Sequence, residues 1–83
     1  MMQEKIFKQK TQNLINQYNK ENYLLVIREA KLLLQKVPNN TFLYNLIGSC
    51  FQNLNDLDNA KVFFERALTI DDKNISALNN IAN

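Results

Sequence analysis

Apolar residues recur along this chain at intervals of three and four positions, which is the spacing of one face of an α-helix. The clearest stripe is made of Tyr23, Val26, Ile27, Ala30, Leu33 and Leu34. Shorter polar segments interrupt the pattern. It predicts helices over residues 3–18, 23–36, 42–54, 57–70 and 75–83.

The polar segments between these stripes have the composition of turns. Residues 19–22 read Asn-Lys-Glu-Asn, and residues 55–56 read Asn-Asp. Pro38 cannot continue a helix and pushes the residue before it out of the α region, so it marks the firmest boundary. Thr41 and Asp56 are expected to cap the helices that follow them. The prediction is an all-α chain of antiparallel helix pairs.

A spacing that begins at Tyr44 starts again 34 residues later. Shifting the chain by this period places residues of similar size and polarity on each other. The matched pairs include Tyr44 with Leu78, Asn45 with Asn79, Ile47 with Ile81 and Gly48 with Ala82. A fixed period of this length is typical of a solenoid. We therefore expect an α-α superhelix of about two repeats plus a partial third.

Small residues have a steric role in such a repeat. Gly in a helix interior costs about 1 kcal/mol relative to Ala, so Gly48 needs a packing reason. We expect Gly48 and Ala60 to lie where the two helices of one unit cross. Tyr44, Phe51 and Phe64 would then fill the gaps beside that crossing.

These positions make residues 41–74 resemble the tetratricopeptide repeat family, whose units are 34-residue helix-turn-helix pairs. The resemblance divides the single domain, 1–83, into a degenerate first repeat at 1–40, a well-matched repeat at 41–74 and the start of a third at 75–83. Leu14 and Tyr18 fit the family best if the turn before Tyr23 is one residue short. The second repeat matches at Tyr44, Ile47, Gly48, Phe51, Ala60, Phe64 and Ala67, and Asp72 stands where the family has Pro.

Composition argues against catalysis. The chain has no His, which excludes Ser–His and Cys–His couples and the common zinc sites. We expect no enzyme activity, no cofactor and no metal. Cys50 is the only cysteine, so no internal disulfide can form, which favours a reducing, cytoplasmic location. Burial as a small core residue is the expected role of Cys50.

Charge and hydropathy bear on the class of partner. The net charge is +2, and the basic residues near the N-terminus fit a solvated helix face better than a nucleic-acid site. No apolar run reaches about 18 residues, so no membrane span is expected. A protein or a peptide is the expected partner.

The resemblance implies where that partner binds. In this family the first helix of each unit lines a concave groove that receives an extended peptide or a partner helix. The expected partner-binding residues are Phe42, Asn45, Leu46, Ser49, Gln52, Asn53, Asn79, Asn80 and Asn83, with Ser76 beside them and Lys8, Thr11, Gln12, Ile15 and Asn19 as additions from the first unit.

Asn45 and Asn79 would form a ladder of amides that suits a peptide backbone. The alternative is that they are solvated surface, because Asn makes up 14 of the 83 residues. The Lys-Asn-Lys-Arg pattern of carboxylate-binding repeats is absent, so recognition of a chaperone C-terminus is not expected.

Three functions are compatible with this sequence. The leading one is a protein-interaction scaffold. The second is an N-terminal, substrate-recruiting segment of a larger bacterial transferase, which the Asn- and Lys-rich first unit resembles. The third is a self-assembling repeat unit, since Leu78 and Ile81 present a packing face whose next layer is missing. We expect self-association through this C-terminal face.

Overall fold

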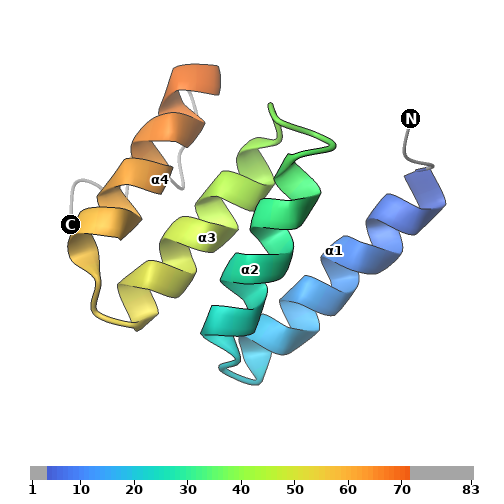
Figure 1. Cartoon of the computed structure of the whole chain (residues 1–83), viewed down its shortest axis with the longest axis horizontal. Helices are drawn as coiled ribbons and strands as arrows, with labels where there is room; N and C mark the ends of the chain where they lie inside the picture. The colour runs from blue at the N-terminus through green and yellow to red at the C-terminus, as the bar shows by residue number, and fades with distance from the viewer. Residues whose placement is uncertain (1–3, 72–83) are drawn as a thin grey trace.

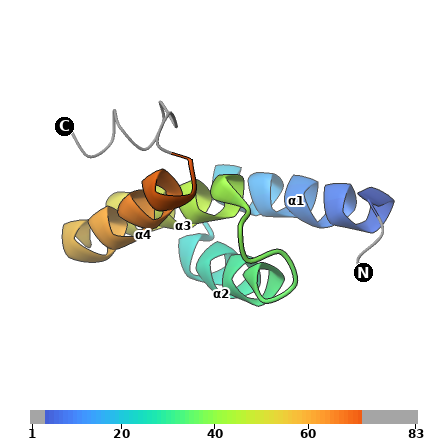
Figure 2. The ribbon, with the colours of Figure 1, turned by 90° about the horizontal axis from the view of Figure 1, so that it is seen from above.

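The computed structural model describes residues 4–71, and this part of the chain contains four α-helices and no strand. Figure 1 shows consecutive helices lying side by side and running in alternating directions. In Figure 2 the first and third helices share one layer and the second lies beneath it. The all-α prediction of antiparallel pairs is confirmed. The helices are α1 (Glu4–Asn19), α2 (Tyr23–Leu34), α3 (Thr41–Asn53) and α4 (Leu57–Ile70).

The predicted boundaries agree with these helices to within two residues, and α4 agrees at both ends. The expected fifth helix, 75–83, lies outside the described residues. We call α1 and α2 the first hairpin, and α3 and α4 the second hairpin. The segment containing Pro38 joins the two hairpins, as predicted, and its carbonyl accepts a hydrogen bond of 3.0 Å from the Tyr44 hydroxyl.

One of the two predicted caps is wrong by one residue. Asn40, not Thr41, is the N-cap of α3, and its side-chain oxygen accepts from the backbone N–H of Leu43 at 3.0 Å. Asn reaches the same unsatisfied donors of the first turn as Thr would, and Thr41 becomes the first helical residue. Asp56 caps α4 as predicted, accepting from the N–H of Asn59 at 3.3 Å.

The turns inside the two hairpins have the same geometry at a separation of 34 residues. Glu21 and Asn55 both adopt left-handed backbone, with φ of 64° and 63°. The N–H of Asn22 donates to the carbonyl of Gln17 at 3.0 Å, and the N–H of Asp56 donates to that of Phe51 at 2.8 Å.

The expectation of a shortened first turn is therefore wrong. Position by position, Leu14 corresponds to Gly48 and Tyr18 corresponds to Gln52, with no slip between the hairpins. Comparison with the family pattern suggested a turn one residue short, because the first hairpin has side chains that differ from that pattern. Its backbone turn nevertheless has the same geometry as that of the second hairpin. The division of the chain into repeats stays a prediction, and this equality of turns supports it.

The core runs through both hairpins. Among the described residues, the buried side chains are all apolar. One cluster joins α1, α2 and α3 with Phe63 of α4, and a second holds Ala60, Phe64 and Ala67. The buried members of the first cluster are Leu14, Val26, Ile27, Ala30, Leu33, Leu34, Leu43, Leu46, Ile47, Cys50 and Phe63.

Gly48 marks the tightest approach within the second hairpin. A Cβ atom placed at Gly48 would lie 2.7 Å from Cε1 of Phe64, closer than side chains approach each other. The prediction that Gly48 must be small for packing is confirmed, and its meeting with Ala60 at the helix crossing stays a prediction. The group that needs the space is the Phe64 ring.

Candidate interaction face

The candidate interaction face is the layer formed by α1 and α3. Six of the predicted partner-binding residues lie on α3. Phe42 and Asn53 are exposed, and Asn45, Ser49 and Gln52 are half-buried. Ser49 and Gln52 are polar side chains that stay partly open to solvent, whereas the side-chain oxygen of Asn45 is buried.

Leu46 differs from the other five. Its side chain is 9% exposed and belongs to the core cluster that joins the two hairpins. Here Leu46 packs the hairpins together, and its apolar surface is already covered. The family resemblance placed Leu46 on this face together with Asn45.

Asn53 connects the two helices of this face. Its Nδ2 group donates to the Tyr18 hydroxyl on α1 at 2.8 Å and to the carbonyl of Ser49 at 2.9 Å. These two bonds use both amide hydrogens, so Asn53 can offer a ligand only its carbonyl oxygen. The bond to Tyr18 also fixes the distance between α1 and α3 at this end of the face.

The residues predicted on α1 make mostly local contacts. Thr11 donates to the carbonyl of Lys8 at 3.0 Å, and Gln12 donates to the side chain of Asn16 at 3.1 Å. Lys8 also lies 3.4 Å from the carboxylate of Glu4. Ile15 is half-buried and Asn19 is exposed.

The remaining predicted residues of the third unit lie outside the described residues. They are Ser76, Asn79, Asn80 and Asn83. The amide ladder from Asn45 to Asn79 stays a prediction for this reason.

Cys50 has no access to solvent. Its side chain is 0% exposed, and burial raises the pKa of the thiol to about 12. Removing a thiolate from water is costly, so the neutral thiol is the stable form. The expected role as a small core residue is confirmed.

Two further searches concern chemistry and membranes. Between residues 4 and 71, the His, Cys, Asp and Glu side chains form no group that could hold a metal ion. None of the helices described is both long enough and apolar enough to cross a membrane.

A cluster of two aromatic rings and two cations, which the sequence analysis did not predict, lies between the hairpins. The Phe63 ring stacks on Phe51 with centroids 5.6 Å apart. Lys31 of α2 and Arg66 of α4 lie 5.5 Å and 5.2 Å from the Phe63 centroid, within the range of cation–π attraction. Arg66 follows Phe63 by three positions, which is a recognisable helical pair. Lys31 comes from another hairpin and carries no such sequence signal.

The structure and this face define a protein built from stacked helical hairpins. Residues 43–74 match the model of the tetratricopeptide repeat family, so this chain carries a tetratricopeptide repeat there. The match falls on the unit expected at 41–74. Searches of curated proteins and of solved structures found no match to the chain.

Proposed function

We propose that this chain is a protein-interaction module that binds a peptide or a partner helix on the face formed by α1 and α3. The observation that carries the proposal is the tetratricopeptide repeat at 43–74, because repeats of this family generally mediate contacts between proteins. On such a scaffold the hairpins supply a rigid support and exposed side chains supply recognition.

The polar residues of α3 support this use of the face. Asn45, Ser49 and Gln52 are half-buried on one side of the helix. Ser49 and Gln52 provide both donors and acceptors, as an extended peptide backbone requires, whereas the side-chain oxygen of Asn45 is buried. Phe42, 42% exposed at the start of α3, adds an apolar contact for a ligand side chain.

The proposal is non-catalytic, because interaction modules of this family act by binding. It includes a cytoplasmic location, for which the single buried cysteine is the support. Recruitment of a substrate to a transferase would use the same face, and the chemistry of that substrate is not specified by these residues.

Selection of peptides from a random library on the full chain would test the binding face. We expect selected peptides to shift the amide signals of Asn45, Ser49 and Gln52 in NMR spectra. The double variant Asn45→Ala/Gln52→Ala should bind them about tenfold more weakly, since each lost hydrogen bond contributes about 0.5–1.5 kcal/mol.

The matched control is Asn39→Ala, because Asn39 is an exposed amide in the segment between the hairpins. It should leave affinity unchanged. Peptides whose signals map away from α1 and α3, with affinity unaffected by the double variant, would contradict the proposal.

Self-association is a second candidate. Helix α4 exposes three large apolar side chains, with Leu57 at 60%, Val62 at 43% and Ile70 at 40%. Covering these side chains with a second copy of the chain would remove apolar surface from water, which favours association. Sedimentation velocity over a wide concentration range tests it: a monomer at every concentration would remove this candidate.

A further inference from the structure

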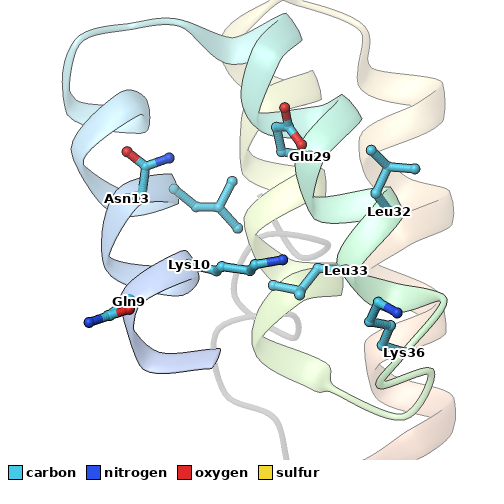
Figure 3. Close-up of a pocket in the computed structure, with 8 residues that line it drawn as sticks. Gln9, Lys10, Asn13, Glu29, Leu32, Leu33 and Lys36 are labelled. Carbon is cyan, nitrogen blue, oxygen red and sulfur yellow. The ribbon is translucent and has the colours of Figure 1, made fainter. Parts of the chain in front are cut away.

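A second surface is the groove between α1 and α2, which uses different residues of α1 from the proposed face. The groove has a volume of about 400 Å³. Figure 3 shows Lys10 reaching from α1 toward Leu33 of α2, with Lys36 at the end of α2 and the second hairpin behind the pair. Leu14 and Leu32 also line it, and Leu32 is 53% exposed.

The 34-residue repeat identifies the part of the second hairpin that corresponds to this groove. Moving the lining residues Gln9, Asn13 and Glu29 forward by 34 positions gives Leu43, Ile47 and Phe63. Those three residues are buried in the cluster that contains the apolar side chains of α2. The corresponding surface of the second hairpin is therefore covered by helix α2. The groove is the equivalent surface of the first hairpin, which no helix among residues 4–71 covers.

The side chains of the groove exclude another copy of the same repeat as its occupant. Gln9, Asn13 and Glu29 are exposed, whereas their counterparts are buried. A helix with the apolar side chains of α2 would bury these polar groups without partners, which is unfavourable. The occupant must carry polar groups around a narrower apolar stripe.

The charges of the lining residues indicate the charge of the helix that would occupy the groove. Lys10 and Lys36 line the groove, and within residues 4–71 neither of them has an ion-pair partner. Glu29 is the only acidic residue of the lining, and its carboxylate lies 3.6 Å from the guanidinium of Arg28. The exposed cations around Leu32 match acidic side chains beside an apolar stripe.

We propose that this groove is a docking site for an amphipathic α-helix whose apolar stripe is flanked by acidic residues. The stripe packs on the exposed side chain of Leu32, and the acidic residues pair with Lys10 and Lys36. The residues that line this site differ from the predicted partner-binding residues, and helix α1 contributes to both surfaces.

A designed peptide tests the proposal on the full chain. The probe is a labelled helix of about 18 residues with Leu at helical spacing and Glu on both sides of the stripe. Fluorescence anisotropy measures its dissociation constant. The variant Lys10→Glu/Lys36→Glu should bind at least about tenfold more weakly, because two attractions become repulsions.

Two matched controls separate the groove from general charge and hydrophobicity. Lys20→Glu/Lys61→Glu makes the same change of net charge at exposed positions outside the groove lining. Leu32→Ala should weaken binding severalfold, whereas Leu24→Ala, on the same helix with 72% of its side chain exposed, should not. A peptide with Lys in place of Glu should not bind.

Three results would overturn the proposal. The first is that the acidic peptide does not bind. The second is an equal loss of affinity in the groove variants and in their controls. The third is a set of NMR shifts centred on Asn45 and Ser49 instead of Asn13 and Leu33. The last result would locate the peptide on the α1 and α3 face and would leave the proposed function standing.

Discussion

The two hairpins have turns of the same geometry but opposite arrangements of large and small side chains. In the second hairpin Gly48 lies against the ring of Phe64. In the first hairpin the corresponding positions hold Leu14 and Ala30, which are 3% and 0% exposed. A large residue has moved from one helix to the other, and total volume is roughly kept. Such swaps preserve packing better than a change at one position alone.

The hairpins also differ on the side that faces the N-terminal end of the stack. Leu43, Ile47 and Phe63 are buried there because α2 covers them. Their counterparts in the first hairpin are the exposed Gln9, Asn13 and Glu29. The same backbone therefore accepts apolar or polar residues according to whether another helix covers the position.

Exchanging the small and large residues at positions 48 and 64 should give the largest effect on the free energy of unfolding. Gly48→Leu overpacks against Phe64 and should cost about 3 kcal/mol, and Phe64→Ala leaves a cavity and should cost about 3–5 kcal/mol. Losses of this size approach the ~5 kcal/mol that stabilises a small domain, so both single variants should lose most of their helical circular dichroism.

The double variant Gly48→Leu/Phe64→Ala reproduces the pair found in the first hairpin. It should be more stable than the sum of the single changes predicts, by at least about 1 kcal/mol, in chemical denaturation. Strict additivity of the two changes would show that the Gly48–Phe64 pair and the Leu14–Ala30 pair are not equivalent ways of filling the same space.

Exchanging polar and apolar residues across the hairpins should give the next effect. Ile47→Asn buries an amide in the core and should lower the free energy of unfolding by about 3 kcal/mol. The reverse change at the matching site, Asn13→Ile, should alter it by less than about 0.5 kcal/mol, because that site is exposed. Urea unfolding of both variants measures the contrast, and equal losses would contradict it.

The helix caps should give a smaller contrast. Asp56→Ala removes the bond to the N–H of Asn59 and should cost about 1 kcal/mol. Asn22 occupies the matching position before α2 but makes no side-chain cap bond, and its amide donates to Gln17 instead. Asn22→Ala should therefore cost only a few tenths of a kcal/mol. Thermal unfolding compares them, and a larger loss at Asn22 would argue against the assigned caps.

The left-handed turn residues should give the smallest effect, with the opposite sign. Glu21 has φ of 64°, a conformation that Asn adopts more readily than Glu. Glu21→Asn copies Asn55 into the first turn and should raise stability by about 0.5 kcal/mol. The control is Lys20→Asn, which introduces the same side chain next to it. If the melting temperature falls for Glu21→Asn and not for the control, the matching of the turns is wrong.

Local signals made much of this fold predictable. Pro38 marked the boundary between the hairpins because it cannot continue a helix, although α2 already ends at Leu34. Asp56 marked the start of α4 because its short carboxylate reaches the free N–H groups. The candidate face was predictable only by resemblance. The resemblance assigned both Asn45 and Leu46 to it, and nothing local distinguished a residue that packs in the core from one that faces solvent.

By itself, the sequence determined the helices, the positions of the turns between them and the repeat at 43–74, because capping, proline geometry and apolar period act within a few residues of each other. Only the tertiary structure decided which side each position faces. It revealed that Leu14 and Ala30 stand in for Gly48 and Phe64, that Lys31 reaches Phe63, and that a groove between α1 and α2 lies open. These facts depend on contacts between residues far apart in the chain, and burial is a property of the packed helices together.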